Sequence, residues 1–89
     1  MIEKTITIIN KYGLHARAAA KFVSTTSAFS STIMIEKDGN SVDGKSIMSV
    51  MMLGAAKGSV IQLQVDGSDE ALALQAIEQI ILNRFDEEE

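Results

Sequence analysis

Apolar and polar residues alternate in several short stretches of the chain, and this period-two pattern is typical of half-buried β-strands. In EKTITII, residues 3–9, isoleucines alternate with threonines. Similar alternation predicts strands over residues 32–37 and 60–65. Asp38-Gly39 favours the positive φ values of a tight hairpin turn, so a further strand is expected to return over residues 40–43.

Helical periodicity separates these predicted strands. Small and apolar side chains recur at helical spacing from Ala16 to about Ala28, which predicts the first helix. Ser46 is a typical N-cap for a short second helix that ends at Leu53. Ser68 is expected to cap the last helix, because acidic residues, which the helix dipole favours, follow it at once. The expected core stripe of that helix consists of Leu74, Ile77 and Ile81.

The predicted order of elements is therefore βαββαβα, in a single domain that covers residues 1–89. A hydrophobic fraction of 46% and a charged fraction of 22% are typical of globular proteins and argue against disorder. Four strands and three helices predict an α+β sandwich with the helices packed on one face of the sheet. We expect residues 86–89 to form a solvated acidic tail.

The composition argues against several classes of protein. The chain has no cysteine and one histidine, so we expect no disulfide, no metal site of the usual composition and no cysteine nucleophile. Its glycines form neither a Walker A loop nor a dinucleotide fingerprint, and no serine-nucleophile motif is present, so we expect no cofactor and no autonomous hydrolase. With short apolar runs and no visible secretion signal, we expect a cytoplasmic protein that does not insert into membranes.

Charge is distributed unevenly along the chain. The net charge of −4 and the shortage of aromatic residues argue against a nucleic-acid-binding module. However, no residue between positions 4 and 35 is acidic, and four residues there are basic. This basic segment indicates an anion site, although chance segregation in a short chain is the alternative.

His15 lies directly before the first predicted helix. A helix N-terminus binds anions and disfavours the imidazolium form, so a ring nitrogen can act as a nucleophile there. Arg17 can present a planar fork of donors to a phosphate or carboxylate, while Lys11 and Lys21 add an attractive field. Gly13 lets the backbone take a positive φ. The alternative is that His15 is an ordinary surface residue of the loop.

The second predicted helix has more apolar residues than one buried stripe can use. Six of the seven residues from 47 to 53 are apolar, so some of them should reach the surface. We expect a patch beside the histidine loop for docking of transient partners, with electrostatic guidance from Arg17 and Lys21. The candidate docking residues on this helix are Ile47, Met48, Met51 and Met52. The alternative is an unusually apolar core helix.

Two motifs give the chain a specific resemblance. GLHARAA, residues 13–19, resembles the active-site motif of the HPr family, the histidine phosphocarriers of the bacterial phosphoenolpyruvate-dependent phosphotransferase system. GKSIMSVMMLG, residues 44–54, resembles the second motif of the family, at the same spacing. The resemblance implies a βαββαβα open-faced sandwich, with a four-stranded antiparallel sheet covered on one face by three helices. It also implies a monomer that acts as a carrier rather than an enzyme.

The resemblance also implies roles for individual residues. Enzyme I would phosphorylate His15 on Nδ1, and His15 would pass the phosphoryl group to a IIA-type acceptor protein. Arg17 would steady the phosphoryl oxygens, and the backbone N–H groups of Ala16 and Arg17 would complete the binding site. Ser46 matches a regulatory serine that a dedicated serine kinase phosphorylates in some members of the family.

The sequence departs from the usual family pattern at Ala18, where proline is common. Alanine is a good helix former, so the cost should be small. Together with Asn10-Lys11 and with Arg84-Phe85 before an acidic tail, Ala18 resembles the nitrogen-related branch, whose carrier feeds a regulatory IIA-type protein. We therefore favour that branch over sugar uptake. A regulator that binds partners through the same surface without phosphoryl turnover is the alternative function.

Overall fold

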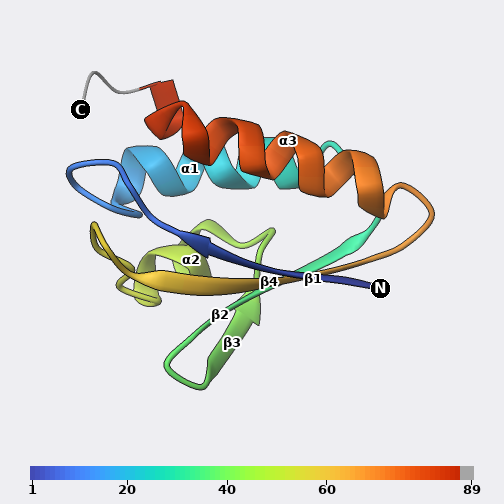
Figure 1. The fold of residues 1–89 in the computed structure, drawn as a ribbon, viewed down its shortest axis with the longest axis horizontal. Helices are drawn as coiled ribbons and strands as arrows, with labels where there is room; N and C mark the ends of the chain where they lie inside the picture. Colours follow the sequence, from blue (N-terminus) through green and yellow to red (C-terminus); the bar gives the residue numbers. More distant parts are fainter. Residues whose placement is uncertain (87–89) are drawn as a thin grey trace.

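The computed structural model describes residues 1–86, and its elements follow the predicted order (Figure 1). They are β1 (Ile2–Thr7), α1 (Ala16–Thr26), β2 (Thr32–Lys37), β3 (Asn40–Asp43), α2 (Ile47–Met52), β4 (Val60–Asp66), α3 (Glu70–Leu82) and the 3-10 turn η1 (Arg84–Asp86). The predicted first strand begins one residue late and ends two residues late, and the predicted first helix also ends two residues late. None of the helices described is long and apolar enough to cross a membrane.

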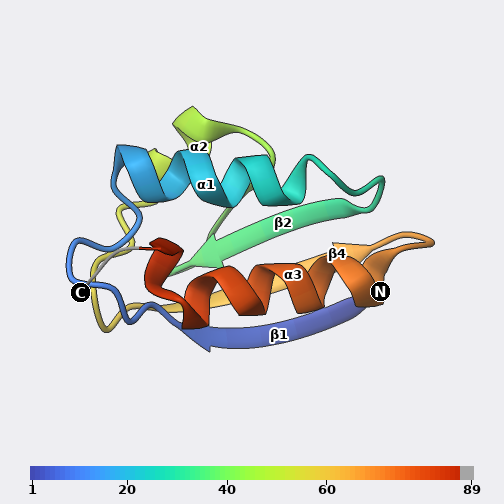
Figure 2. The same cartoon turned by 90° about the horizontal axis from the view of Figure 1, so that it is seen from above.

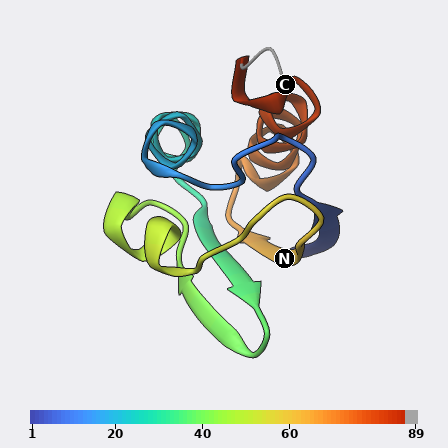
Figure 3. The ribbon, with the colours of Figure 1, turned by 90° about the vertical axis from the view of Figure 1, so that its left-hand side faces the viewer.

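Within residues 1–86, the strands form one antiparallel sheet in the order β1-β4-β2-β3. The hairpin predicted at Asp38-Gly39 joins β2 to β3, and both residues have a positive φ. Helices α1 and α3 lie side by side over one face of the sheet, which Figure 2 shows from above. Helix α2 packs against α1 and next to β3 (Figure 3). The α+β open-faced sandwich is thereby confirmed.

The core lies between the sheet and its helices. On the sheet it contains alternate residues of β2 and β4, because a strand presents every second side chain to the same face. These buried residues are Ile33, Ile35, Ile61, Leu63 and Val65. From α1 it contains a stripe of Ala18, Ala19, Phe22 and Val23.

The core stripe of α3 differs slightly from the predicted one. Ile77 and Ile81 are buried as expected, but Ala73 takes the third place and Leu74 is only partly buried. Residues 73, 77 and 81 lie four apart on one helix face, whereas Leu74 lies on the flank of that face.

The prediction that Ser68 caps α3 is wrong. The N-cap is Asp69, and its side chain makes no capping hydrogen bond. The carboxylate of Asp69 instead accepts hydrogen bonds from the backbone N–H groups of Ser30 and Ser31, at 2.9 and 3.0 Å, and from the hydroxyl of Ser31. Asp69 thus joins the start of α3 to the segment that enters β2. These hydrogen bonds, above all that from Ser31, lower the pKa of Asp69 to about 2.

Candidate functional site

The loop before α1 is fixed by contacts with the segment that follows α2. Gly13 has a φ of +63°, and a Cβ atom there would lie only 2.3 Å from the carbonyl oxygen of Ala55. The N–H of Leu14 donates to that same oxygen at 2.8 Å. The buried amide of Asn10 donates to the carbonyl of Gly13 at 2.7 Å. The backbone that leads into the next residue, His15, is therefore held on two sides.

His15 is the N-cap of α1, and its ring takes part in the cap. The carbonyl oxygen of His15 accepts a hydrogen bond from the N–H of Ala19 at 2.8 Å, which closes the first helical turn. Nδ1 of the imidazole accepts from the backbone N–H of Arg17 at 3.3 Å. Accepting this bond requires a lone pair on Nδ1, so the proton of the neutral ring is on Nε2. The nucleophilic lone pair thus points toward the positive end of the α1 dipole.

The ring of Tyr12 also contacts the imidazole of His15. Its ring is perpendicular to that of His15, with an interplanar angle of 88° and 5.9 Å between the ring centroids. Nζ of Lys11 lies 5.4 Å from the centroid of the Tyr12 ring. Tyr12 is not among the predicted site residues, because its only signal in the sequence is an aromatic residue three positions before the histidine.

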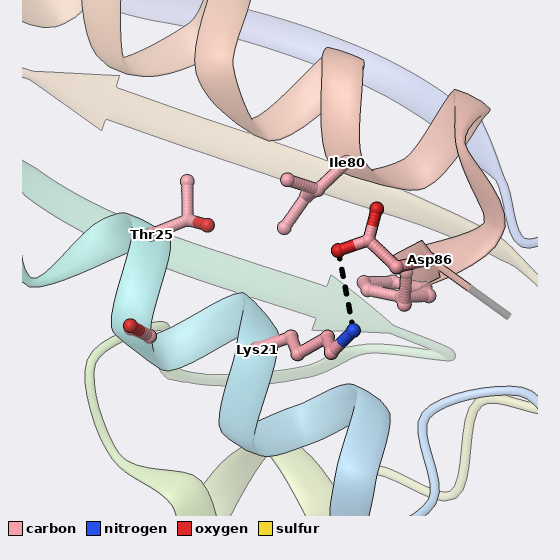
Figure 4. A pocket seen from close by; sticks show the side chains of 6 residues that line it. Lys21, Thr25, Ile80 and Asp86 are labelled. Carbon is pink, nitrogen blue, oxygen red and sulfur yellow. Dashed lines mark hydrogen bonds and ion pairs between the residues drawn. The ribbon is translucent and has the colours of Figure 1, made fainter.

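The basic segment is partly neutralised by acidic residues from the other end of the chain. Nζ of Lys21 lies 3.2 Å from a carboxylate oxygen of Asp86, beside a pocket between α1 and η1 (Figure 4). Nζ of Lys4 lies 3.9 Å from Glu78 on α3. The other two basic residues of the segment, Lys11 and Arg17, are exposed and lie within four positions of His15 in the sequence.

The predicted solvated tail begins one residue too early, because Asp86 is part of the folded structure. Its carboxylate pairs with Lys21, and the residue belongs to the turn η1. The preceding residue, Phe85, is buried with an exposed fraction of 1%, and residues 84–86 all have a positive φ. The rest of the predicted tail, residues 87–89, lies outside the described part of the chain.

Helix α2 exposes most of its apolar side chains. The hydroxyl oxygen of Ser46 accepts a hydrogen bond from the N–H of Ser49 at 3.3 Å, so Ser46 is the N-cap as predicted. Only Val50 is buried in this helix. The exposed side chains are the expected ones: Ile47, Met48, Met51 and Met52. Since α2 leads directly into the segment that holds Gly13, this apolar patch adjoins the His15 loop, and the alternative of a core helix is wrong.

The site has donors that suit an anion. Among residues 1–86, no three histidine, cysteine or carboxylate side chains come together as potential metal ligands. A nitrogen with a lone pair, the backbone N–H groups at the start of α1 and the exposed Arg17 suit a group that brings negative charge to Nδ1.

Comparisons with known proteins agree with this chemistry. Residues 2–83 match the family model described as the phosphorylation site of the HPr component of the phosphotransferase system. The chain is 52% identical to a phosphocarrier protein HPr of Neisseria meningitidis over the full length of both chains. It is 53% identical to one of Pseudomonas aeruginosa over 94% of each chain.

Solved structures of HPr proteins also superpose on this chain. The structure of HPr from Thermoanaerobacter tengcongensis superposes with a TM-score of 0.96 at 50% identity, over all of both chains. The HPr of Bacillus anthracis superposes with a TM-score of 0.86 at 41% identity, over 90% of this chain and 95% of that one.

Proposed function

Because the chain belongs to the HPr family, the phosphocarriers of the bacterial phosphotransferase system, we propose that His15 is its phosphoryl acceptor. Enzyme I transfers to Nδ1 a phosphoryl group that originates in phosphoenolpyruvate, and His15 passes this group to a IIA-type acceptor protein. The observation that carries the proposal is the hydrogen bond from the N–H of Arg17 to Nδ1, which aims the lone pair at the start of α1.

The geometry supports an attack that needs no proton transfer at the nucleophile. Nδ1 carries a lone pair, so its bond to phosphorus forms as the bond between phosphorus and the donor breaks. The phosphoryl oxygens then lie where the helix dipole favours negative charge. The backbone N–H groups of Ala16 and Arg17 and the guanidinium of Arg17 stabilise these oxygens, which is the main contribution a carrier makes to phosphoryl transfer.

The exposed patch of α2 is the proposed docking surface for both partners. Methionine side chains adapt to different contacts, which suits a carrier that must bind a donor and an acceptor in turn. The patch consists of Ile47, Met48, Met51 and Met52. Lys21 is the proposed electrostatic guide for partners, although its side chain faces α3 and η1, where Asp86 offsets part of its charge.

The hydroxyl of Ser46 is a further proposed phosphorylation site, for a serine kinase. It is half-buried at the first turn of α2, where a phosphate would be tolerated by the dipole but would put charge beside the apolar patch.

We further propose that the carrier belongs to the nitrogen-related branch and is a cytoplasmic monomer. The branch assignment rests on Asn10-Lys11, on Ala18 in place of proline and on Arg84-Phe85. Asn10, Ala18 and Phe85 are buried, while Lys11 lies over the Tyr12 ring.

Intact-mass spectrometry tests this function. The protein is incubated with phosphoenolpyruvate and purified enzyme I from either branch, beside a His15→Ala control. We expect a gain of one acid-labile phosphoryl group that is absent in the control, and a faster gain with the nitrogen-related enzyme. A faster gain with the sugar-branch enzyme would reverse the branch assignment. No gain with either, from folded protein, would favour the regulator that binds without turnover.

A further inference from the structure

The perpendicular contact between the rings of Tyr12 and His15 lies outside the hydrophobic core. The Tyr12 side chain is 65% exposed, so its ring contributes little to the buried apolar area. Its backbone is nevertheless fixed, because the N–H of Gly13 donates to the carbonyl of Asn10 at 3.2 Å and the Asn10 amide donates to the carbonyl of Gly13. An exposed aromatic ring on a rigid turn is thus held against the reactive side chain.

We propose that Tyr12 is a positioning residue for phosphoryl transfer, whose ring keeps Nδ1 of His15 directed at the start of α1. The proposal rests on the proposed role of His15 as phosphoryl acceptor. Rings 5.9 Å apart and at 88° to each other have the geometry of an attractive edge-to-face pair.

The hydrogen bond from the N–H of Arg17 does not by itself fix the orientation of the imidazole. The bond from the N–H of Arg17 to Nδ1 is long, at 3.3 Å, and exposed to solvent. The torsion between Cβ and the ring is broad and roughly two-fold, so a half-turn of the imidazole would replace Nδ1 by a carbon atom. The Tyr12 ring, on a different part of the loop, restricts that rotation.

Lys11 gives the Tyr12 ring a second function. Its ammonium group lies 5.4 Å from the centroid of that ring, within the range of a cation–π contact. The contact keeps a positive charge at the Tyr12 ring, which also contacts His15, and this charge attracts an incoming anionic phosphoryl donor.

The test compares Tyr12→Leu, which removes the aromatic ring, with Tyr12→Phe, which keeps it. Because the chain has one histidine, the ring signals of His15 are identified directly by NMR. Phosphorylation is then followed by intact mass with phosphoramidate, a small-molecule donor, and separately with enzyme I and phosphoenolpyruvate. Both variants should unfold within about 3 °C of the unchanged protein, since Tyr12 is exposed.

We expect Tyr12→Leu to move the His15 ring signals and to slow phosphorylation about three- to ten-fold with either donor, as loss of an edge-to-face pair predicts. Tyr12→Phe should stay within about two-fold of the unchanged protein. Unchanged ring signals or an unchanged rate in Tyr12→Leu would overturn the proposal. An equal loss in Tyr12→Phe, or a loss with enzyme I alone, would also overturn it, because the hydroxyl or docking would then be responsible.

The two donors separate this proposal from the proposed function. In one outcome, enzyme I does not phosphorylate the protein, but the rate of phosphorylation by phosphoramidate still depends on the Tyr12 ring. This outcome would support the positioning role and contradict the carrier function. Phosphorylation by enzyme I that is as fast in Tyr12→Leu as in the unchanged protein would support the carrier function and contradict the positioning role.

Discussion

At the residue scale, Gly13 shows how a backbone position without a side chain shapes the site. Its positive φ and its close approach to Ala55 allow the loop of His15 to pack against the segment after α2. A Cβ atom there would meet backbone atoms, which cannot move aside as the end of a flexible side chain can.

Gly13→Ala is therefore expected to destabilise the protein by at least about 3 kcal/mol, the sum of backbone strain and a steric clash. Gly39→Ala is the matched control, because Gly39 also has a positive φ but a Cβ atom there would meet nothing within 4 Å. This control should cost about 1 kcal/mol, from strain alone. Urea unfolding measures both values, and equal losses would contradict the role given to the contact with Ala55.

At the element scale, α2 combines an N-cap with an exposed apolar patch. Aspartate is as good an N-cap as serine and its charge suits the first turn, so Ser46→Asp should leave the fold intact. The added charge lies beside side chains that must be desolvated on docking, and we expect the Kd for enzyme I to rise roughly ten-fold. Calorimetric titration measures this change. Ser41→Asp is the control, because Ser41 is exposed on strand β3. An unchanged Kd in Ser46→Asp would contradict the docking role of α2.

The start of α3 is expected to show a pH-dependent contribution to stability. The carboxylate of Asp69 is the form that accepts hydrogen bonds from Ser30 and Ser31, which lowers its pKa from 3.8 to about 2. The stabilisation by these hydrogen bonds is thus complete above the pKa that Asp69 has in the unfolded chain. It is lost as the pH falls through the pKa of about 2 in the folded protein.

Asp69→Asn should accordingly lower Tm at pH 7, and its difference from the unchanged protein should shrink as the pH falls from about 4 toward 2. Thermal unfolding across this range measures the difference. Glu36→Gln, on the open face of the sheet, should show no such convergence. A difference in Asp69→Asn that stays constant with pH would show that the carboxylate charge is not involved.

The sequence predicts elements better than it predicts contacts between them. Alternation in β2 and β4 and the hairpin residues identified the sheet, because these signals are local in sequence. The edge-to-face contact of Tyr12 was missed, although Tyr12 is close to His15 in sequence, since ring orientation depends on side-chain torsions. Asp69 was missed as a partner of Ser31 because the two lie on different segments that only the fold brings together.

At the scale of the whole molecule, η1 closes the core at the end of α3. Phe85 is almost fully buried although residues 84–86 all have left-handed backbone angles. Such angles are unfavourable, so burial of this ring has to compensate for them. The burial of Phe85 was not predicted, because no periodic pattern of apolar residues continues past α3.

Phe85→Ala is expected to lower the free energy of unfolding by about 3 to 4 kcal/mol, as truncation of a buried phenylalanine does. Leu82→Ala is the control, because Leu82 is 66% exposed at the end of the preceding helix α3, and it should cost about 0.5 kcal/mol or less. Urea unfolding compares the two variants. A loss in Phe85→Ala as small as that of the control would mean that η1 does not contribute to the core.

The central claim is that the fold directs Nδ1 of His15, and no other atom, at the phosphoryl group. The most direct test is a long-range proton–nitrogen NMR spectrum of the protein after incubation with phosphoenolpyruvate and enzyme I, in which the single histidine gives one set of ring nitrogens. We predict that phosphorus is bonded to Nδ1 and hydrogen to Nε2, in agreement with the hydrogen bond that Nδ1 accepts from Arg17. A phosphoryl group on Nε2, or on a serine with the imidazole unmodified, would contradict the account.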